Sequence, residues 1–259
     1  MKPAALVFAL AALAPAAARA GETACWFEQG VIVAPASIAG LAGDYIIDTG
    51  APVTQLHETK AQAAGLTETA QVGEVRLAGL TLAGRRFSVV DLDSRTWAFP
   101  TPIAGVIGAD LLSGYVVDVS FAPCRVAIHP LRRAPRFGPA QALPLKTLGG
   151  VATARAAVSD GPTAFSGDFV VATGADAPVR IGQDRASAPG AKPADILPGG
   201  ERRATLRAAS FAGLLLENLP SGLTPPAAPS AGVIGAPLLA RWRLRFDFPH
   251  RRLLLAPAG

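Results

Sequence analysis

The sequence predicts a mostly β protein built from two similar halves, and an internal repeat is the first reason. Segments 43–51 and 167–175 align without a gap and read GDYIIDTGA and GDFVVATGA. Five of their nine residues are identical, and only Asp48 against Ala172 is a sharp difference. The aromatic and β-branched run before each Thr-Gly is typical of a buried strand.

A second repeat lies downstream of the first. Segments 104–112 and 231–239 read AGVIGADLL and AGVIGAPLL, and β-rich runs follow each of them, at 115–121 and 242–248. Both halves therefore contain, in the same order, a strand, a Thr-Gly turn, a β-rich middle, a Gly-x-x-Gly turn, a short helix and closing strands. Repeated order of this kind indicates duplicated structural units.

Helical signals are few, which supports the mostly β prediction. Residues 58–65 are expected to form a short helix that ends at Gly65. The closing strands contain Asp118 and Asp247, which we expect at the surface or in turns. A Pro- and Ala-rich stretch at 186–198 is expected to be a surface loop of the second half.

The chain divides into four parts. Residues 1–20 have the features of a signal peptide, with Lys2 before an apolar stretch and Ala18-Arg19-Ala20 at the end. Residues 21–129 form the first lobe, residues 130–144 with four prolines form a linker, and residues 145–259 form the second lobe. Export to the periplasm or to the outside of the cell is expected.

Two cysteines bear on the same expectation. In an exported chain, Cys25 and Cys124 are candidates for a disulfide that ties the start of the first lobe to its end. The alternative is two free thiols.

The two motifs together resemble those of the aspartic peptidases, and the resemblance is nearest to the retropepsin-like and bacterial exported branches. Its basis is a buried strand ending in Asp48-Thr49-Gly50, followed by Val106-Ile107-Gly108-Ala109-Asp110-Leu111. The resemblance implies a bilobal fold of two β-barrel-like lobes and a hydrolase that activates water. Asp48 would be a catalytic aspartate supported by Thr49 and Gly50, with Thr173 and Gly174 as the matching support in the second lobe. Asp110 would be structural.

The second lobe departs from the family at Ala172, the lost catalytic position. In the family two aspartates share one proton, so that one acts as base and the other as acid. Alanine can neither hold nor donate a proton, so an isolated monomer is expected to have little peptidase activity. Asp176, within a two-residue insertion that appears when Pro178-Val179 is aligned with Pro52-Val53, is a candidate substitute.

Further features of the cleft follow from the resemblance. Residues 75–91 are expected to form the flap hairpin over the substrate, although no tyrosine is found for its tip. Trp97 and Phe99 are candidates for the cleft wall. The histidines His57, His129 and His250 are isolated in sequence and expected at the surface.

Other functions are disfavoured. No metal-binding, nucleophile-elbow or phosphate-loop motif is found, so neither a metal nor a cofactor is expected. A formal charge of +5 is too weak and scattered to indicate nucleic acid, and no membrane anchor is expected.

Three functions remain open. The chain is an aspartic-type peptidase that obtains its second carboxylate from Asp176 or from Asp48 of a second copy, as a homodimer. Alternatively, it is a monomeric pseudopeptidase that binds a peptide or protein ligand without cutting it. The third function is a scaffold with no ligand.

Overall fold

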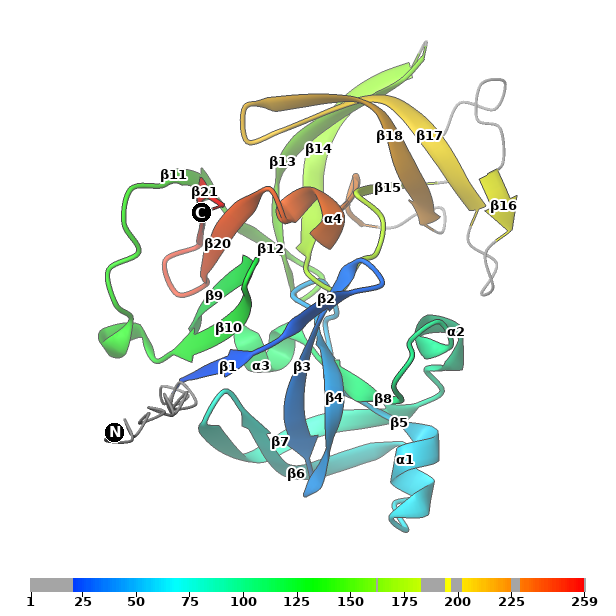
Figure 1. Ribbon diagram of the computed structural model, residues 1–259, viewed down its shortest axis with the longest axis vertical. Coiled ribbons are helices and arrows are strands. Elements are labelled where there is room, and N and C mark those ends of the chain that lie inside the picture. Colours follow the sequence, from blue (N-terminus) through cyan, green and yellow to red (C-terminus); the bar gives the residue numbers. More distant parts are fainter. Residues whose placement is uncertain (1–20, 162, 183–193, 197–201, 225–228, 259) are drawn as a thin grey trace, which may run out of the picture.

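The computed structural model describes residues 21–161, 163–182, 194–196, 202–224 and 229–258. The predicted signal peptide at 1–20 lies outside the described residues, as does most of the predicted loop at 186–198. Figure 1 shows two β-rich lobes, the first below and the second above, with a further sheet beside them. No helix in the described ranges is long and apolar enough to cross a membrane.

The first lobe is a closed barrel. Its strands are β2 (Trp26–Glu28), β3 (Val31–Ile38), β4 (Leu41–Ile47), β5 (Gln55–His57), β6 (Ala70–Leu77), β7 (Leu80–Val90) and β8 (Ile103–Ile107). They are ordered β2-β3-β4-β8-β5-β7-β6, and β6 pairs back to β3 to close the barrel. The helices are α1 (Glu58–Ala63), α2 (Asp93–Thr96) and α3 (Ala109–Leu112). The predicted helix at 58–65 is therefore present, with Gly65 at a φ of 77° just beyond it.

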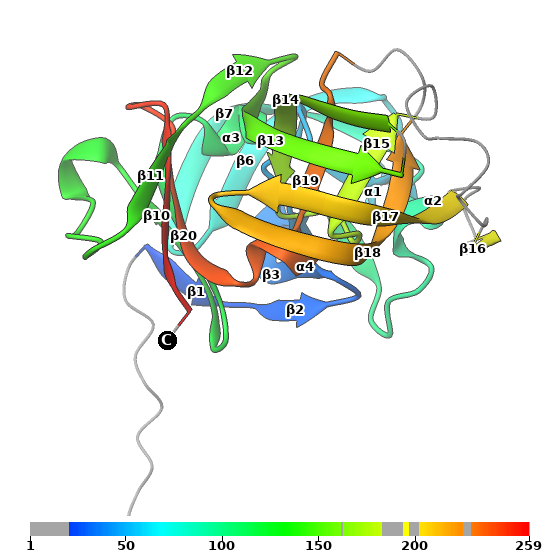
Figure 2. The same ribbon diagram turned by 90° about the horizontal axis from the view of Figure 1, so that it is seen from above.

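The second lobe repeats this plan, as Figure 2 shows from above. Its strands are β12 (Lys146–Leu148), β13 (Val151–Asp160), β14 (Thr163–Ala172), β15 (Val179–Gly182), β16 (Ala194–Ile196), β17 (Arg202–Phe211), β18 (Leu214–Thr224) and β19 (Gly232–Gly235), followed by helix α4 (Ala236–Leu239). The order is β12-β13-β14-β19-β15-β18-β17-β16, and the pairing of β17 with β13 closes the barrel.

The repeated motifs meet at the centre of each barrel. In the first lobe β4 runs parallel to β8, with Ile47 beside Ile107. In the second lobe β14 runs parallel to β19, with Val171 beside Ile234. Each Thr-Gly turn is therefore adjacent to the Gly-x-x-Gly turn of its own lobe.

A backbone carbonyl and an aromatic ring together explain the first glycine of each Gly-x-x-Gly. A β-carbon on Gly105 would collide with the carbonyl oxygen of Gln55, and one on Gly232 with that of Arg180. Tyr45 and Phe169 hold equivalent positions and are fully buried. A β-carbon on Gly105 would lie 2.9 Å from the Tyr45 ring, and one on Gly232 would lie 2.6 Å from the Phe169 ring. The Tyr45 hydroxyl donates a 2.6 Å hydrogen bond to the carbonyl of Leu41, and burial raises the pKa of Tyr45 to about 12.

A third sheet joins the lobes. It contains β1 (Glu22–Ala24), β9 (Val116–Phe121), β10 (Cys124–His129), β11 (Gln141–Pro144), β20 (Trp242–Asp247) and β21 (Arg252–Pro257), in the order β1-β10-β9-β20-β21-β11. The predicted linker at 130–144 contains a 3₁₀ turn, Leu131–Arg133, and β11, which pairs with β21. Cys25 and Cys124, the candidate pair, form a disulfide at one edge of this sheet.

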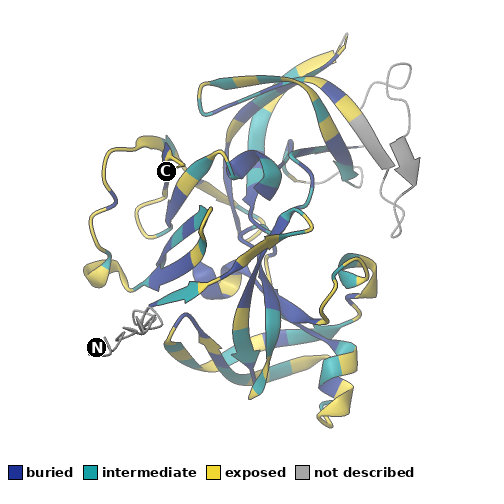
Figure 3. Cartoon of the chain, viewed as in Figure 1, coloured by how far each residue is buried: buried dark blue, intermediate teal, exposed yellow. Residues whose placement is uncertain are grey.

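Ion pairs within the third sheet correct one expectation. At its centre Arg245 donates to Asp118 through Nε at 2.6 Å and Nη2 at 2.7 Å. Asp247 is the last residue of β20, is 4% exposed and accepts hydrogen bonds from Arg252 and His250, so the expected surface or turn position is wrong. Burial alone would raise the pKa of Asp247, but the bonds from Arg252 and His250 lower it overall. Buried residues run through both barrels and this sheet (Figure 3).

Candidate active-site cleft

The two Thr-Gly turns meet between the lobes and hold each other by reciprocal hydrogen bonds. The Thr49 hydroxyl donates to the carbonyl of Val171, and the Thr173 hydroxyl donates to the carbonyl of Ile47, both at 2.6 Å. Each hydroxyl also accepts from the backbone N–H of the other threonine, at 3.1 and 3.2 Å. Both threonines are fully buried. The loss of the second aspartate has therefore left this support intact.

Both Thr-Gly turns require their glycine, because each glycine lies against the opposite turn. A β-carbon at Gly174 would collide with the side chain of Asp48, and one at Gly50 would collide with the β-carbon of Ala172. Asp48 and Ala172 thus occupy matching places in the two turns. Ala172 therefore lies in the second turn at the place that Asp48 holds in the first, and its role as a lost catalytic position stays a prediction.

The carboxylate of Asp48 is fully engaged. Its Oδ1 accepts from the backbone N–H of Gly50 at 2.7 Å and of Gly174 at 3.2 Å. Its Oδ2 accepts from Nη2 of Arg95 at 2.6 Å. The Asp48 side chain is 8% exposed. Asp48 therefore acts as an acceptor on both oxygens, and three donors balance its negative charge.

Arg95 is a site residue that the sequence reasoning missed. It lies on α2, and its Nη2 also donates to the carbonyl of Gly174 at 3.0 Å, so it contacts both turns. The start of α2 is held by Asp93, whose carboxylate lies 3.1 Å from Nε2 of His57. His57 is buried, which corrects its predicted surface position. No local motif marks Arg95, because only the tertiary fold brings α2 to the Thr-Gly turns.

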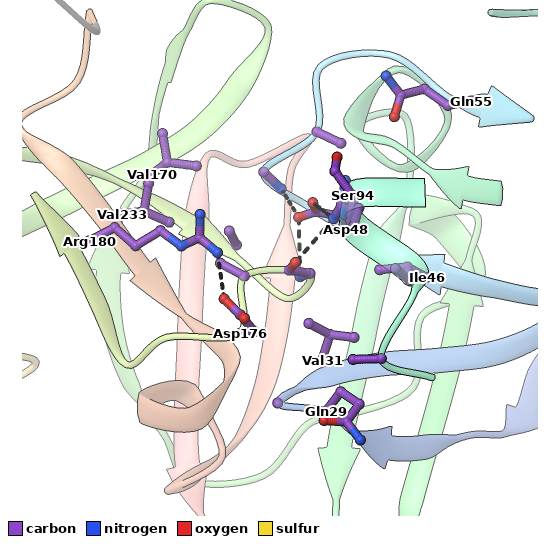
Figure 4. A pocket seen from close by; sticks show the side chains of 18 of the residues that line it. Gln29, Val31, Ile46, Asp48, Gln55, Ser94, Val170, Asp176, Arg180 and Val233 are labelled. Carbon is purple, nitrogen blue, oxygen red and sulfur yellow. Dashed lines mark hydrogen bonds and ion pairs between the residues drawn. The ribbon is translucent and has the colours of Figure 1, made fainter. Parts of the chain in front are cut away.

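A cleft of about 950 Å³ opens at the turns. Figure 4 shows Asp48 and Ser94 on one side of it and the Asp176–Arg180 pair on the other. The predicted wall residues Trp97 and Phe99 both line the cleft, and Trp97 is 57% exposed. Apolar side chains complete the wall, among them Val31, Ile46, Val170 and Val233.

The predicted flap does not cover this cleft. The hairpin exists as β6 and β7, but no residue of 75–91 is among the described residues that line the cleft. Val75 pairs with Ile38, and the side chains of Val75, Leu77 and Phe87 are buried in the barrel. Closing the barrel therefore turns this hairpin away from the site, and the segment containing α2, Trp97 and Phe99 forms the wall instead.

Asp176 does not take the place of the missing aspartate. It lines the cleft, but its carboxylate is paired with the guanidinium of Arg180. Strand pairing also shows that the second lobe has an insertion of one residue before Val179, rather than the predicted two. Gln55 and Arg180 are equivalent, since each pairs with the middle residue of its Gly-x-x-Gly segment, Val106 and Val233.

The Gly-x-x-Gly turns are supported differently in the two lobes. In the first lobe Thr54 accepts from the N–H of Gly108 at 3.0 Å and donates to Asp110 at 2.7 Å, which gives Asp110 the predicted structural role. By the corrected alignment Val179 takes the place of Thr54, and Pro237 takes that of Asp110. There the N–H of Gly235 donates to the carbonyl of Pro178 at 3.0 Å.

One group of potential metal ligands lies beside the cleft in the described ranges. Atoms of His57, Asp91 and Asp93 lie within 4.8 Å of one another, and both aspartates are exposed. Structural contacts account for the group: Asp91 accepts from the N–H of Asp93 at 2.7 Å, and Asp93 pairs with His57. By itself this group does not define a metal site.

Comparisons with known proteins agree with the fold. A family model described as an aspartyl protease matches residues 34–116. The crystal structure of an aspartic proteinase from Irpex lacteus aligns with a TM-score of 0.52 and 12% identity, over 92% of this chain and 97% of that chain. A search of curated proteins finds no match. Residues 34–116 of the first lobe are therefore similar to the aspartyl protease family, and the whole chain has the two-lobed fold of an aspartic proteinase.

Proposed function

We propose that this chain is an exported pseudopeptidase that binds extended peptides between its lobes without hydrolysing them. The observation that carries the proposal is the pairing of Asp48 with Arg95 opposite Ala172. The fold and family support a peptidase-like protein, whereas the loss of hydrolysis and the export are our inference.

The chemistry of the site supports the loss of hydrolysis. An aspartic peptidase needs a base to deprotonate water and an acid to protonate the substrate carbonyl, and one positioned acid or base contributes roughly 10²–10⁴-fold to the rate. Ala172 supplies no acid. Arg95 occupies the oxygen of Asp48 that is not bonded to the glycines, where a base would accept the proton of water. Both halves of the reaction are therefore impaired.

The cleft supports the binding of a peptide. It is open between two lobes and combines apolar side chains with polar groups from both sides. The exposed indole of Trp97 offers a large surface for a ligand side chain. An extended segment offers carbonyl and N–H groups that the polar lining can bind.

Two features support export. The leader-like pattern at 1–20 has the composition that a signal peptidase recognises. The disulfide between Cys25 and Cys124 suits an oxidising compartment.

The test compares cleavage with binding in the same samples. Purified protein lacking residues 1–20 is incubated with a diverse mixture of short peptides from about pH 3 to 7, a range that spans the shared-proton state of a carboxylate pair. Products are followed by mass spectrometry, and bound peptides are recovered on the immobilised protein. We expect bound peptides without cleavage products.

The control variant is Asp48→Asn. Cleavage by the natural protein that disappears in Asp48→Asn would show a working aspartate and overturn the proposal in favour of a peptidase. If that cleavage rose with the square of the protein concentration, it would indicate a second copy as the source of the acid. Absence of both cleavage and retained peptides would leave the scaffold function.

A further inference from the structure

Arg95 has more hydrogen-bonding capacity than the protein uses. A guanidinium carries five N–H donors on three nitrogens. The two contacts of Arg95, to Asp48 Oδ2 and to the carbonyl of Gly174, both use Nη2. Nε and Nη1, with three N–H groups between them, have no partner among the described residues.

These unused groups are open to solvent at the cleft. Arg95 lines the cleft, and its side chain is 30% exposed. Nε and Nη1 of Arg95 have no partner in the described ranges and are not buried, so both nitrogens are accessible. Unused donors in a cleft wall are available for a ligand that offers an acceptor.

The guanidinium is held in place from two sides. Asp48 and the Gly174 carbonyl fix Nη2, and the backbone of α2 is anchored through the contact of Asp93 with His57. An arginine whose geometry is set before binding loses little rotamer freedom when a ligand arrives. Asp48 then serves as a positioning residue for Arg95.

The charges of the cleft favour an acidic partner at Arg95. The described lining contains four charged residues, which form two pairs, Asp48–Arg95 and Asp176–Arg180. Asp48 also accepts from two backbone N–H groups, so its charge is balanced by more than Arg95 alone. Without the predicted signal peptide, which contains Lys2 and Arg19, the chain carries a formal charge of +3, which does not oppose an anionic ligand.

We propose that Arg95 is a recognition residue that binds a carboxylate of the peptide ligand through Nη1 or Nε. This inference rests on the proposed function, since it names the kind of peptide that the cleft takes. In this arrangement Asp48 holds the guanidinium that binds the ligand. The carboxylate comes from an acidic side chain or from the C-terminus of the peptide.

The test measures the binding of matched peptides by fluorescence anisotropy. Fluorescent eight-residue peptides carry Glu, Gln or Lys at a central position, and each is made with a free and with an amidated C-terminus. Charge-assisted hydrogen bonds are stronger than neutral ones, so we expect the Glu or the free-acid peptide to bind about tenfold more tightly than its neutral counterpart. The series that shows the difference identifies the source of the carboxylate.

Three variants assign the preference to Arg95. Arg95→Gln removes the guanidinium, and we expect the preference for the acidic peptide to fall to within about twofold or to reverse. As controls, Arg132→Gln and Arg241→Gln each remove an equal charge from an exposed position outside the cleft lining. Both controls are expected to keep the preference. Thermal unfolding confirms that each variant is folded.

The outcomes separate this inference from the proposed function. If peptides bind with no preference for a carboxylate, or if the preference survives Arg95→Gln, the role of Arg95 is overturned while the peptide-binding function stands. If no peptide of any charge binds to the natural protein, the proposed function fails and this inference fails with it.

Discussion

The two lobes share one scaffold but differ in the polar side chains around their central turns. Thr49 and Thr173 exchange equivalent hydrogen bonds, and Gly50 and Gly174 allow equivalent close approaches. In contrast, only the first lobe retains an aspartate in the turn. The threonines and glycines that join the two turns are the same in both repeats, whereas the residue between the strand and the threonine is aspartate in one and alanine in the other.

The supporting residues have changed in matched pairs. Thr54 and Asp110 bond to each other in the first lobe, and their counterparts in the second lobe are the apolar residues Val179 and Pro237. Replacing both partners of this part-buried hydrogen bond leaves no orphaned group, and this explains how the second lobe stays stable. The comparison teaches that the second lobe keeps the same fold with fewer polar side chains around its central turns.

The largest expected effect is a gain in the rate of peptide cleavage when a second carboxylate is introduced at position 172. The variant Ala172→Asp with Arg95→Ala restores two facing carboxylates and removes the competing guanidinium. We expect its rate of peptide cleavage near pH 4 to exceed that of the natural protein by roughly 10²-fold or more. Timed mass spectrometry of a peptide mixture measures the rate.

The matched control for this gain is Ala172→Asn with Arg95→Ala, which has the same shape without the acid. Equal rates in the two variants would show that the second lobe no longer supports catalysis, and that the lobes differ by more than one side chain.

A large loss of stability is expected at the contact between the lobes. Asp118 and Arg245 are equivalent positions of the two repeats, yet they carry opposite charges and pair across the third sheet. Among the described residues, Arg245→Met leaves the part-buried carboxylate of Asp118 with only the ring of His129, 3.5 Å away, as a charge partner. Breaking a fully buried pair costs about 3–5 kcal/mol, so we expect a loss near the lower end of that range. Urea unfolding measures the free energy.

The double variant Asp118→Leu with Arg245→Met provides the comparison, because it removes both charges. It is expected to recover most of the loss. A double variant as unstable as Arg245→Met would show that packing, rather than the unpaired charge, determines the cost.

A smaller and one-sided effect is expected at the Gly-x-x-Gly turns. Thr54→Val leaves the N–H of Gly108 without its partner and removes a donor from Asp110, at a cost of about 1–3 kcal/mol. The counterpart change, Val179→Ala, removes only apolar contacts in a lobe that has no such network. Urea unfolding measures both variants, and the dependence of the unfolding free energy on urea concentration should be unchanged in each. Only Thr54→Val should also weaken the binding of a peptide in the cleft. Equal effects on binding would contradict the proposed difference between the lobes.

The smallest effect concerns pH. The pKa of Asp247 is lowered in the folded state, because hydrogen bonds from Arg252 and His250 outweigh the effect of its burial. Its contribution to stability is therefore present above the unfolded pKa of about 4 and is lost as the pH falls through the lower folded value. Asp247→Asn should flatten the decline in unfolding free energy below about pH 4, whereas the exposed Glu217→Gln should leave it unchanged.

The repeats predicted most of the fold and the two Thr-Gly turns of the site, but not Arg95. Strand, turn and Gly-x-x-Gly follow one another locally, so their order can be recognised in both halves, and Asp48, Thr49, Ala172 and Thr173 occupy the expected turns. The flap prediction failed because a hairpin pattern does not tell where the hairpin packs, and here Val75 and Leu77 close the barrel. Sequence matching also misjudged the insertion before Val179 by one residue, which strand pairing corrected.

By itself, the sequence determined that this chain has two similar lobes, with Asp48 in the first Thr-Gly turn and Ala172 at the same place in the second. Short local motifs are enough to identify these features. Only the tertiary structure decided what faces that carboxylate. Asp48 and Arg95 lie 47 residues apart, and α2 carries no motif that links it to the Thr-Gly turns. Their 2.6 Å contact exists because the closed barrel and the paired turns bring α2, Gly174 and Asp48 to one point.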